Sequence, residues 1–126
     1  MALIKKSLSK LVGVHPDLVR VLELAATMLP FDLHVVEGLR SVERQAALVK
    51  SGASWTMMSR HLTGHAVDVA PVVDGELRWD WPLYNKIAPV MKLAATRLNV
   101  ALEWGGDWTK NKKDGPHFQL SRKVYK

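Results

Sequence analysis

The stretch S-R-H-L-T-G-H-A-V-D-V-A-P (Ser59 to Pro71) combines two histidines and a carboxylate with a short strand-like run. From Ala66 onward the side chains alternate between two faces, so Asp68 lies opposite the face shared by Val67 and Val69. An apolar core does not accommodate a lone carboxylate, and Asp68 therefore faces a site or solvent. The stretch predicts a β-strand that presents Asp68 on its polar face.

The two histidines of this stretch differ in what they can reach. His65 shares the valine face if the strand already includes it, whereas His61 precedes the turn at Gly64 and can fold back toward Asp68. Histidines four residues apart could also bind zinc from one face of a helix, but Gly64 interrupts such a helix and the following V-D-V is strand-like. We therefore pair His61 with Asp68. The alternative is a polar loop with one capping histidine.

A third candidate ligand lies near the C-terminus, in D-G-P-H-F-Q-L (residues 114–120). After the Gly-Pro turn, alternation directs Phe118 and Leu120 inward and leaves His117 on the opposite face. Two histidines and one carboxylate leave a fourth coordination position open for water, as catalytic zinc sites do. Asp114 precedes His117 by three residues across a tight turn, which makes it the candidate general base.

Four motifs in a fixed order make the chain resemble a known peptidase family. They are Glu37-Gly38-Leu39-Arg40-Ser41, Ser59 to Asp68, Trp104-Gly105-Gly106-Asp107-Trp108 and Asp114 to His117. With them the chain resembles the zinc D-alanyl-D-alanine carboxypeptidase and L-alanyl-D-glutamate endopeptidase family of peptidoglycan hydrolases. Within that family it is most similar to the short endolysins of tailed bacteriophages.

The resemblance implies a cofactor and a set of site residues. One zinc ion per chain would be held by His61, Asp68 and His117. Arg40 would bind a substrate carboxylate or stabilise the oxyanion, with Asp114 as the base. Many relatives carry glutamate where this chain has the shorter Asp114. The substrate cleft would also include Ser41, Ser59, Trp104 and Gly105.

The resemblance leaves more than one function open. We expect cleavage of the L-alanyl-D-glutamate bond of bacterial peptidoglycan for host cell lysis, because a small basic chain fits a lysin that reaches an anionic wall by diffusion and charge attraction. The alternative within the family is a D-alanyl-D-alanine carboxypeptidase. An alternative from another class is a non-enzymatic, basic polyanion-binding domain in which the three candidate ligands are only surface polar residues.

Length, cysteine content and charge restrict these functions further. A chain of 126 residues fits one catalytic domain (1–126) without a separate cell-wall-binding module. There are no cysteines, so any metal must bind to histidine and carboxylate ligands. The net charge of +6 indicates attraction to polyanions, but the basic residues are dispersed and no RNA-binding aromatic signature is present. We therefore expect no nucleic-acid partner.

No stretch has the apolar length of a signal peptide or the roughly 20 apolar residues of a membrane span. We expect a monomer without membrane insertion that is made in the host bacterial cytoplasm. The resemblance to phage endolysins implies that the protein acts on the cell wall after a separate membrane-permeabilising protein gives it access.

Periodicity and turn signals predict the order of the secondary-structure elements. Helical spacing follows Pro16 and ends at Pro30, with His15 expected to be a cap or a surface group and not a ligand. A strand follows over residues 33–38. Ser41 is expected to cap a second helix that ends at Gly52.

The second half of the chain is also predicted to contain strands and a helix in turn. Asp74-Gly75 predicts a hairpin over residues 72–79, and helical spacing begins again at Pro82, with Pro89 expected to kink or divide that helix. A strand follows over residues 100–104. Ser54 to Met58 is read as a lid or as core packing. The pattern predicts an α+β fold in which a small antiparallel sheet carries the zinc site and packs with about three helices.

Overall fold

The computed structural model describes residues 1–54 and 56–126, and its centre is one antiparallel sheet. The strands lie in the order β1-β2-β5-β4, and β3 pairs with β2 on the edge opposite β1, beyond the stretch of β2 that pairs with β5. Their bounds are β1 Asp32–Glu37, β2 Ala66–Val73, β3 Glu76–Leu77, β4 Leu102–Trp104 and β5 His117–Leu120. The predicted α+β class with a small antiparallel sheet is confirmed.

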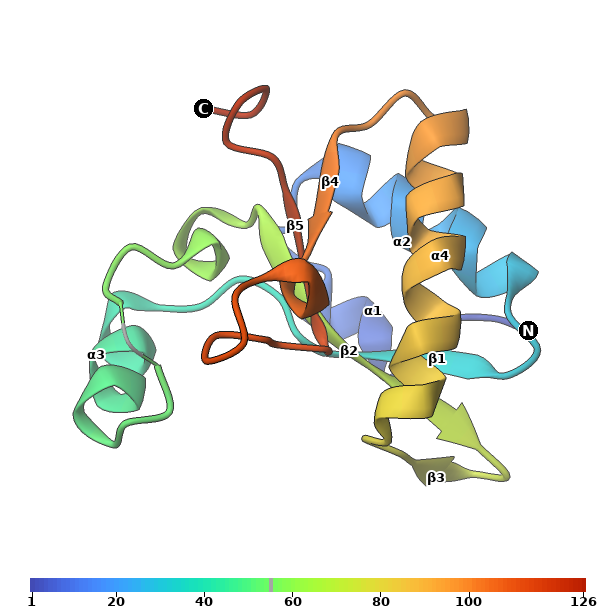
Figure 1. Ribbon diagram of the computed structural model, residues 1–126, viewed down its shortest axis with the longest axis horizontal. Helices are drawn as coiled ribbons and strands as arrows, with labels where there is room; N and C mark the ends of the chain where they lie inside the picture. Colours follow the sequence, from blue (N-terminus) through green and yellow to red (C-terminus); the bar gives the residue numbers. More distant parts are fainter. Residues whose placement is uncertain (55) are drawn as a thin grey trace.

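Three longer helices and one short helix accompany the sheet. They are α1 Ser7–Lys10, α2 Pro16–Met28, α3 Val42–Lys50 and α4 Trp81–Arg97, and two single 3₁₀ turns span Arg60–Thr63 and Gly105–Asp107. Helices α2 and α4 lie side by side over one face of the sheet, and α3 stands apart from them beyond the other face (Figure 1). None of the helices in the described part of the chain has the length and apolarity needed to cross a bilayer.

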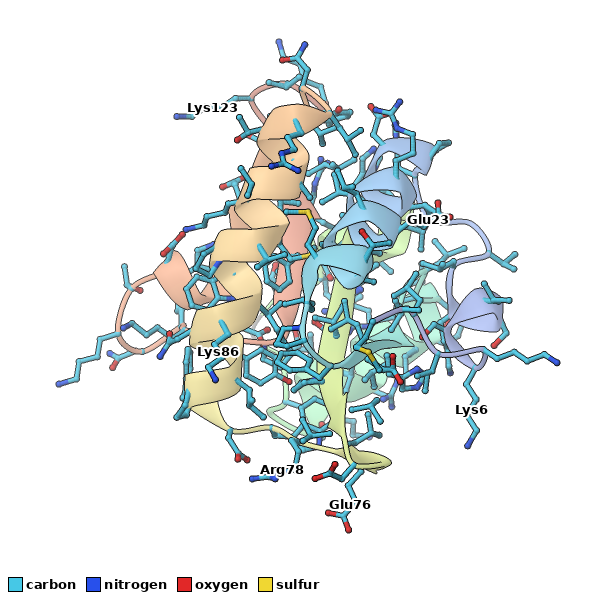
Figure 2. The ribbon with its side chains drawn as sticks, turned by 90° about the vertical axis from the view of Figure 1, so that its right-hand side faces the viewer. Lys6, Glu23, Glu76, Arg78, Lys86 and Lys123 are labelled. Atoms are coloured by element: carbon cyan, nitrogen blue, oxygen red, sulfur yellow. The ribbon has the colours of Figure 1, made fainter. Side chains whose placement is uncertain are left out.

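The core lies between the α2–α4 pair and the sheet. Charged side chains such as Glu23 and Lys86 point outward from these two helices (Figure 2). The residues between the layers have no exposed surface and include Leu18, Leu22, Ile87, Met91, Val67, Val69, Phe118 and Leu120. Burying a side chain of this size contributes about 1.5–3 kcal/mol relative to leaving it in water. The valine face of β2 is therefore fixed against the core, and Asp68 must face the other way.

Local signals in the sequence explain most element boundaries. Helix α2 begins with Pro16 at its first position, and the His15 Nδ1 accepts a hydrogen bond from the Asp17 N–H at 3.0 Å. Ser41 Oγ accepts from the Arg44 N–H at 3.1 Å and caps α3. The β2–β3 hairpin turns through Asp74-Gly75, whose φ values of 52° and 80° are those of a two-residue type I′ turn.

Pro89 was expected to kink or divide the last long helix, and the division does not occur. Helix α4 runs from Trp81 to Arg97 with Pro89 inside it. Proline removes one N–H donor and leaves the carbonyl four residues earlier, on Asn85, without its helical partner. Both residues are exposed, so water can hydrate that carbonyl, while the buried Ala88 and Met91 hold the helix against the core.

Gly64 ties the 3₁₀ turn to the N-terminal segment and generates a prediction about stability. Its φ is +76°, and a Cβ at this position would lie 2.1 Å from the Gly13 carbonyl oxygen. Gly64→Ala should lower the free energy of unfolding in urea by about 3 kcal/mol, since backbone strain and a clash add. Gly52→Ala is the matched control, because Gly52 has φ +84° with nothing within 4 Å. Equal losses in the two variants would contradict the packing role of Gly64.

Candidate active site

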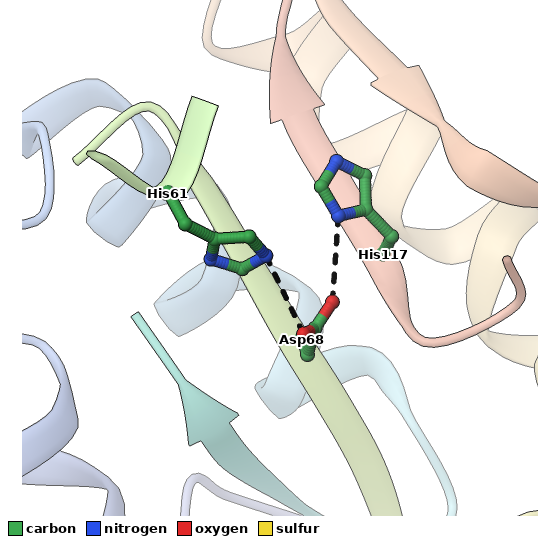
Figure 3. A group of neighbouring side chains, drawn as sticks. All are labelled: His61, Asp68 and His117. Carbon is green, nitrogen blue, oxygen red and sulfur yellow. Dashed lines mark ion pairs between the residues drawn. The ribbon is translucent and has the colours of Figure 1, made fainter. Parts of the chain in front are cut away.

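Three side chains from separate elements converge on the polar face of the sheet (Figure 3). His61 comes from the 3₁₀ turn before β2, Asp68 from β2, and His117 from the first position of β5, where it lies directly opposite Asp68. His61 Nε2 lies 3.4 Å from Asp68 Oδ2, and His117 Nδ1 lies 3.4 Å from Asp68 Oδ1. One potential ligand atom from each residue lies within 4.8 Å of the others.

The outer nitrogen of each histidine ring is held by a carbonyl oxygen. His61 Nδ1–H donates to the Gly38 backbone oxygen at 2.9 Å, and His117 Nε2–H donates to Gln119 Oε1 at 2.8 Å. A neutral imidazole carries one proton, so both rings then turn an unprotonated nitrogen toward Asp68. Two lone pairs and a carboxylate that point at one another favour a cation between them.

The distances between these atoms fit a divalent metal better than direct hydrogen bonds. Charge-assisted N–H···O bonds are about 2.7–2.9 Å long. The two observed separations of 3.4 Å run to different oxygens of Asp68. Each is close to the edge of a tetrahedron around an ion with ligand distances of about 2.0–2.1 Å, which is roughly 3.3–3.4 Å. Asp68 Oδ1 is moreover buried without a hydrogen-bond donor among the described residues. The donor set therefore fits a metal ion.

The charges of Asp68 and His117 depend on each other. Burial alone would raise the pKa of Asp68, but the facing His117 and His61 rings outweigh it and hold that pKa below its ordinary value. Burial would lower the pKa of His117, but Asp68 outweighs it and raises that pKa. Without a metal, a proton on His117 thus supplies the positive charge that Asp68 requires.

Asp114 lies beside this group on the loop that leads into β5. The backbone N–H of Asp114 donates to the Gly105 carbonyl oxygen at 3.0 Å, and the backbone carbonyl oxygen of Asp114 accepts from the His117 N–H at 3.2 Å. A Cβ on Gly105 would lie 2.3 Å from the Asp114 oxygen and 3.0 Å from the His117 Cβ, so only glycine allows this approach. Burial, and then the negative charge of Asp68, raise the pKa of Asp114. A raised pKa makes a carboxylate a stronger proton acceptor, as a general base requires.

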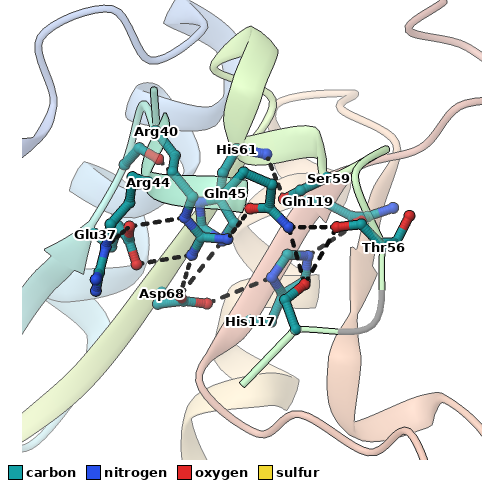
Figure 4. A network of polar contacts seen from close by, with 12 residues as sticks. Glu37, Arg40, Arg44, Gln45, Thr56, Ser59, His61, Asp68, His117 and Gln119 are labelled. Atoms are coloured by element: carbon teal, nitrogen blue, oxygen red, sulfur yellow. Dashed lines mark hydrogen bonds and ion pairs between the residues drawn. The ribbon is translucent and has the colours of Figure 1, made fainter. Parts of the chain in front are cut away.

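The Arg40 guanidinium is engaged on several sides (Figure 4). Its Nε and Nη2 donate to the two carboxylate oxygens of Glu37 at 2.8 and 2.7 Å, and Nη1 donates to Gln45 Oε1 at 2.7 Å. Its Nη2 also lies 3.6 Å from Asp68 Oδ2, and the side chain is only 8% exposed. Arg40 therefore connects Glu37 and α3 to Asp68, and its paired N–H groups are not free for a second carboxylate.

A cavity of about 460 Å³ opens over these residues. This volume lies in the range of small-molecule sites. Of the residues expected from the sequence, the cavity is lined by Arg40, Ser59, His61, Asp68, Asp114 and His117. The segment expected to act as a lid contributes Ser54, Thr56 and Met58, while its Trp55 lies outside the described residues.

Three residues expected in the cleft lie elsewhere. Ser41 is exposed and caps α3. Trp104 is 9% exposed, stacks on Phe118 and donates from Nε1 to the Gly115 oxygen at 2.7 Å, behind the loop that carries Asp114. Gly105 supports the same loop. Trp104 and Gly105 therefore support the Asp114 loop from behind, and none of the three residues is among those that line the cavity.

Several residues around the site were not singled out from the sequence. Gln119 lies two residues after His117 in the strand, so alternation alone indicated that the two side chains share a face. Gln45 has no comparable signal, because a glutamine in a polar helix is ordinarily exposed, yet it is fully buried and donates to Ser54 Oγ and the Thr56 oxygen at 2.9 and 2.5 Å. Trp108 also lines the cavity, with its ring 4.9 Å from that of His117.

The chain is similar to known proteins in both sequence and fold. Residues 1–123 match the sequence profile of a family described as phage L-alanyl-D-glutamate peptidase. The L-alanyl-D-glutamate peptidase of Escherichia phage T5 is 30% identical over 125 residues, which are 96% of this chain and 90% of the relative. The crystal structure of the Serratia marcescens L-Ala D-Glu endopeptidase ChiX matches with a TM-score of 0.91 and 48% identity, covering 98% of this chain and 92% of that one.

A more distant structure shares the fold. It is the vancomycin-resistance D,D-dipeptidase VanXYg, with a TM-score of 0.56 and 22% identity, covering 85% of this chain and 50% of that one. At this identity the likeness is one of fold alone.

The Asp68–His117 pair predicts a pH window for the metal-free protein. The lowered pKa of Asp68 stabilises the folded state above about pH 4, and this contribution is lost as the pH falls. The raised pKa of His117 stabilises the folded state below about pH 6.5, and this contribution is lost as the pH rises. The difference in Tm between metal-stripped wild type and Asp68→Asn should therefore be largest between these limits. Thermal unfolding from pH 3 to 9 measures it, and a constant difference would contradict the pairing.

Proposed function

Because this chain belongs to the phage L-alanyl-D-glutamate peptidase family, we propose that it hydrolyses the amide bond between L-alanine and D-glutamate in peptidoglycan stem peptides. The reaction would use one zinc ion at His61, Asp68 and His117. The observation that carries this proposal is the convergence of two imidazole nitrogens and a carboxylate beside Asp114, in a cavity large enough for a peptide segment. A surface that merely binds polyanions has no need of this buried group.

Zinc suits the donor set for chemical reasons. Two imidazoles and one carboxylate at tetrahedral spacing resemble catalytic zinc sites, which keep a fourth position open. Zinc bound there would lower the pKa of water to about 7 and polarise the scissile carbonyl. Gly38 and Gln119 support such a role because they fix which nitrogen of each histidine faces inward.

The remaining roles fall to residues of the chain itself. Asp114 would accept the proton of the attacking water and pass it to the leaving amine, for which its raised pKa is suited. Arg40 would act as a positioning residue that helps to orient Asp68 from 3.6 Å away, since Glu37 and Gln45 already occupy its guanidinium. Ser59 Oγ accepts from the His61 N–H at 3.2 Å and would hold the turn that presents this ligand.

Access to the wall is part of the same proposal. The protein would be made in the host cytoplasm and act on the wall as a monomer during lysis, after a separate protein has permeabilised the membrane. Membership of a family of phage peptidases supports this route.

The products identify the bond that is cut. Mass spectrometry of purified peptidoglycan after digestion should reveal new amino-terminal D-glutamate on the released stem fragments. Release of free D-alanine from otherwise intact stems would instead make the protein a D-alanyl-D-alanine carboxypeptidase. No release of either, with zinc bound, would refute the peptidase proposal.

Two variants should separate metal binding from proton transfer. His117→Ala should lose zinc in elemental analysis together with activity, because one of three ligands is gone. Asp114→Ala should keep zinc and lower turnover by about 100-fold or more, in the range for a lost general base. Asp107→Ala is the matched control, since this aspartate is exposed and pairs with Lys92. Loss of zinc from Asp114→Ala would make Asp114 a ligand and overturn its role as base.

A further inference from the structure

Two arginines on one wall of the cavity have no acidic partner. Arg60 and Arg122 both line it, and no carboxylate of the described residues lies within ion-pair distance of either guanidinium. The third arginine of the cavity, Arg40, is in contrast paired with Glu37. Arg60 and Arg122 thus lack a direct ion pair among the described residues, and Glu103 acts on Arg60 only through a longer-range attraction.

The two unpaired arginines are held beside each other by reciprocal hydrogen bonds. Arg60 Nη2 donates to the Leu120 oxygen at 3.2 Å, two residues before Arg122. Arg122 Nη2 donates to the Met58 oxygen at 2.7 Å, two residues before Arg60. Each guanidinium is therefore anchored to the segment that carries the other, where the chain leaves β5 and where the 3₁₀ turn begins (Figure 1).

The burial of Arg60 makes this arrangement costly without an anion. The residue is 8% exposed, its Nη2 contacts only carbonyl oxygens, and its Nε has no hydrogen-bond acceptor among the described residues. Removing a cation from water costs several kcal/mol unless an opposite charge compensates for it. Arg122 is exposed, and its Nε and Nη1 have no partner in the described part of the chain. Arg122 can therefore offer a fork of N–H groups to a planar anion while Arg60 adds fixed positive charge.

We propose that Arg60 and Arg122 form the subsite that binds the α-carboxylate of the D-glutamate residue whose amide bond is cut. This inference rests on the proposed function and assigns the substrate carboxylate to this wall of the cavity, not to Arg40. D-glutamate is joined to the rest of the stem through its γ-carboxyl group, so its α-carboxylate is free. That carboxylate is attached to the same carbon as the leaving nitrogen, and it must therefore lie within a few ångströms of the reacting bond.

The position of the subsite agrees with this chemistry. Arg60 directly precedes the candidate ligand His61, and Arg122 follows three residues after Gln119, which holds His117. An anion bound between the two guanidinium groups lies in the same cavity as both histidines and Asp114. The subsite would thus orient the amino side of the scissile bond and discriminate against stems in which the α-carboxyl group is amidated.

Two synthetic stem peptides test the proposal, one with D-glutamate and one with D-isoglutamine, whose α-carboxyl is a carboxamide. Arg122→Gln should lower kcat/KM for the D-glutamate peptide by roughly 10- to 100-fold, the range for a lost charge-assisted bond, and leave the carboxamide peptide nearly unchanged. Arg122→Lys should recover part of the preference. Arg97→Gln, an exposed arginine of α4 outside the cavity, is the matched control and should change neither. Equal losses on both peptides would show a merely structural role for Arg122 and overturn the proposal.

Binding measurements separate this proposal from the proposed function. Calorimetry with a product peptide that begins with D-glutamate should show tighter binding to the wild type than to Arg122→Gln, and no such difference for the D-isoglutamine peptide. A wild type that cleaves neither peptide but binds in this pattern would refute the peptidase and keep the anion subsite. A wild type that cleaves and binds both peptides equally well would keep the peptidase and refute the subsite.

Discussion

The register between β2 and β5 is the constraint on which the site depends. It pairs Asp68 with His117 on the polar face and Val67 with Phe118 beside them, and the latter two side chains are fully buried in the core. Because strand side chains alternate, a slip of one residue would turn Asp68 into the core and Val67 into the cavity. The packing of α2 and α4 against the valine face of β2 therefore fixes the direction of the Asp68 carboxylate, although neither helix carries a residue of the site. The Val69 N–H adds to this pairing by donating to the Pro116 oxygen at 3.0 Å.

Each side chain around Asp68 and His117 is held in its orientation by a second contact. Gly38 and Gln119 determine which nitrogen of each histidine faces inward, and Arg40 brings positive charge to the far side of Asp68. Gln45 then links Arg40 to the Thr56 oxygen, which connects α3 to the rim of the cavity. These contacts reduce the cost of collecting charged groups in a partly buried place, since each is satisfied before a substrate arrives. Asp68 Oδ1 and the Arg60–Arg122 pair are exceptions among the described residues. The two arginines have no carboxylate within ion-pair distance, and an anionic substrate group would complete them.

The sequence predicted those features that follow from local patterns. Alternation around Asp68 and His117 predicted their faces, and the caps at His15 and Ser41 and the Asp74-Gly75 turn predicted element boundaries that the structure confirms. Features that depend on packing between distant segments were not predictable in this way. The hydrogen bonds of Arg40 depend on where both Glu37 and Gln45 lie in the folded chain. The position of Trp104 behind the Asp114 loop depends on its stacking against Phe118. Pro89 lies within an unbroken helix because its neighbours pack on the core, which propensity alone does not reveal.

We propose that His61 Nε2, His117 Nδ1 and the Asp68 carboxylate share one zinc ion. Crystals of the zinc-loaded protein can test this by anomalous diffraction at the zinc absorption edge. We expect a single strong peak within about 2.0–2.2 Å of these three groups, with His61 Nδ1 still bonded to Gly38 and His117 Nε2 to Gln119. A peak elsewhere, or a zinc ion bound through the outer nitrogen of either histidine, would contradict it.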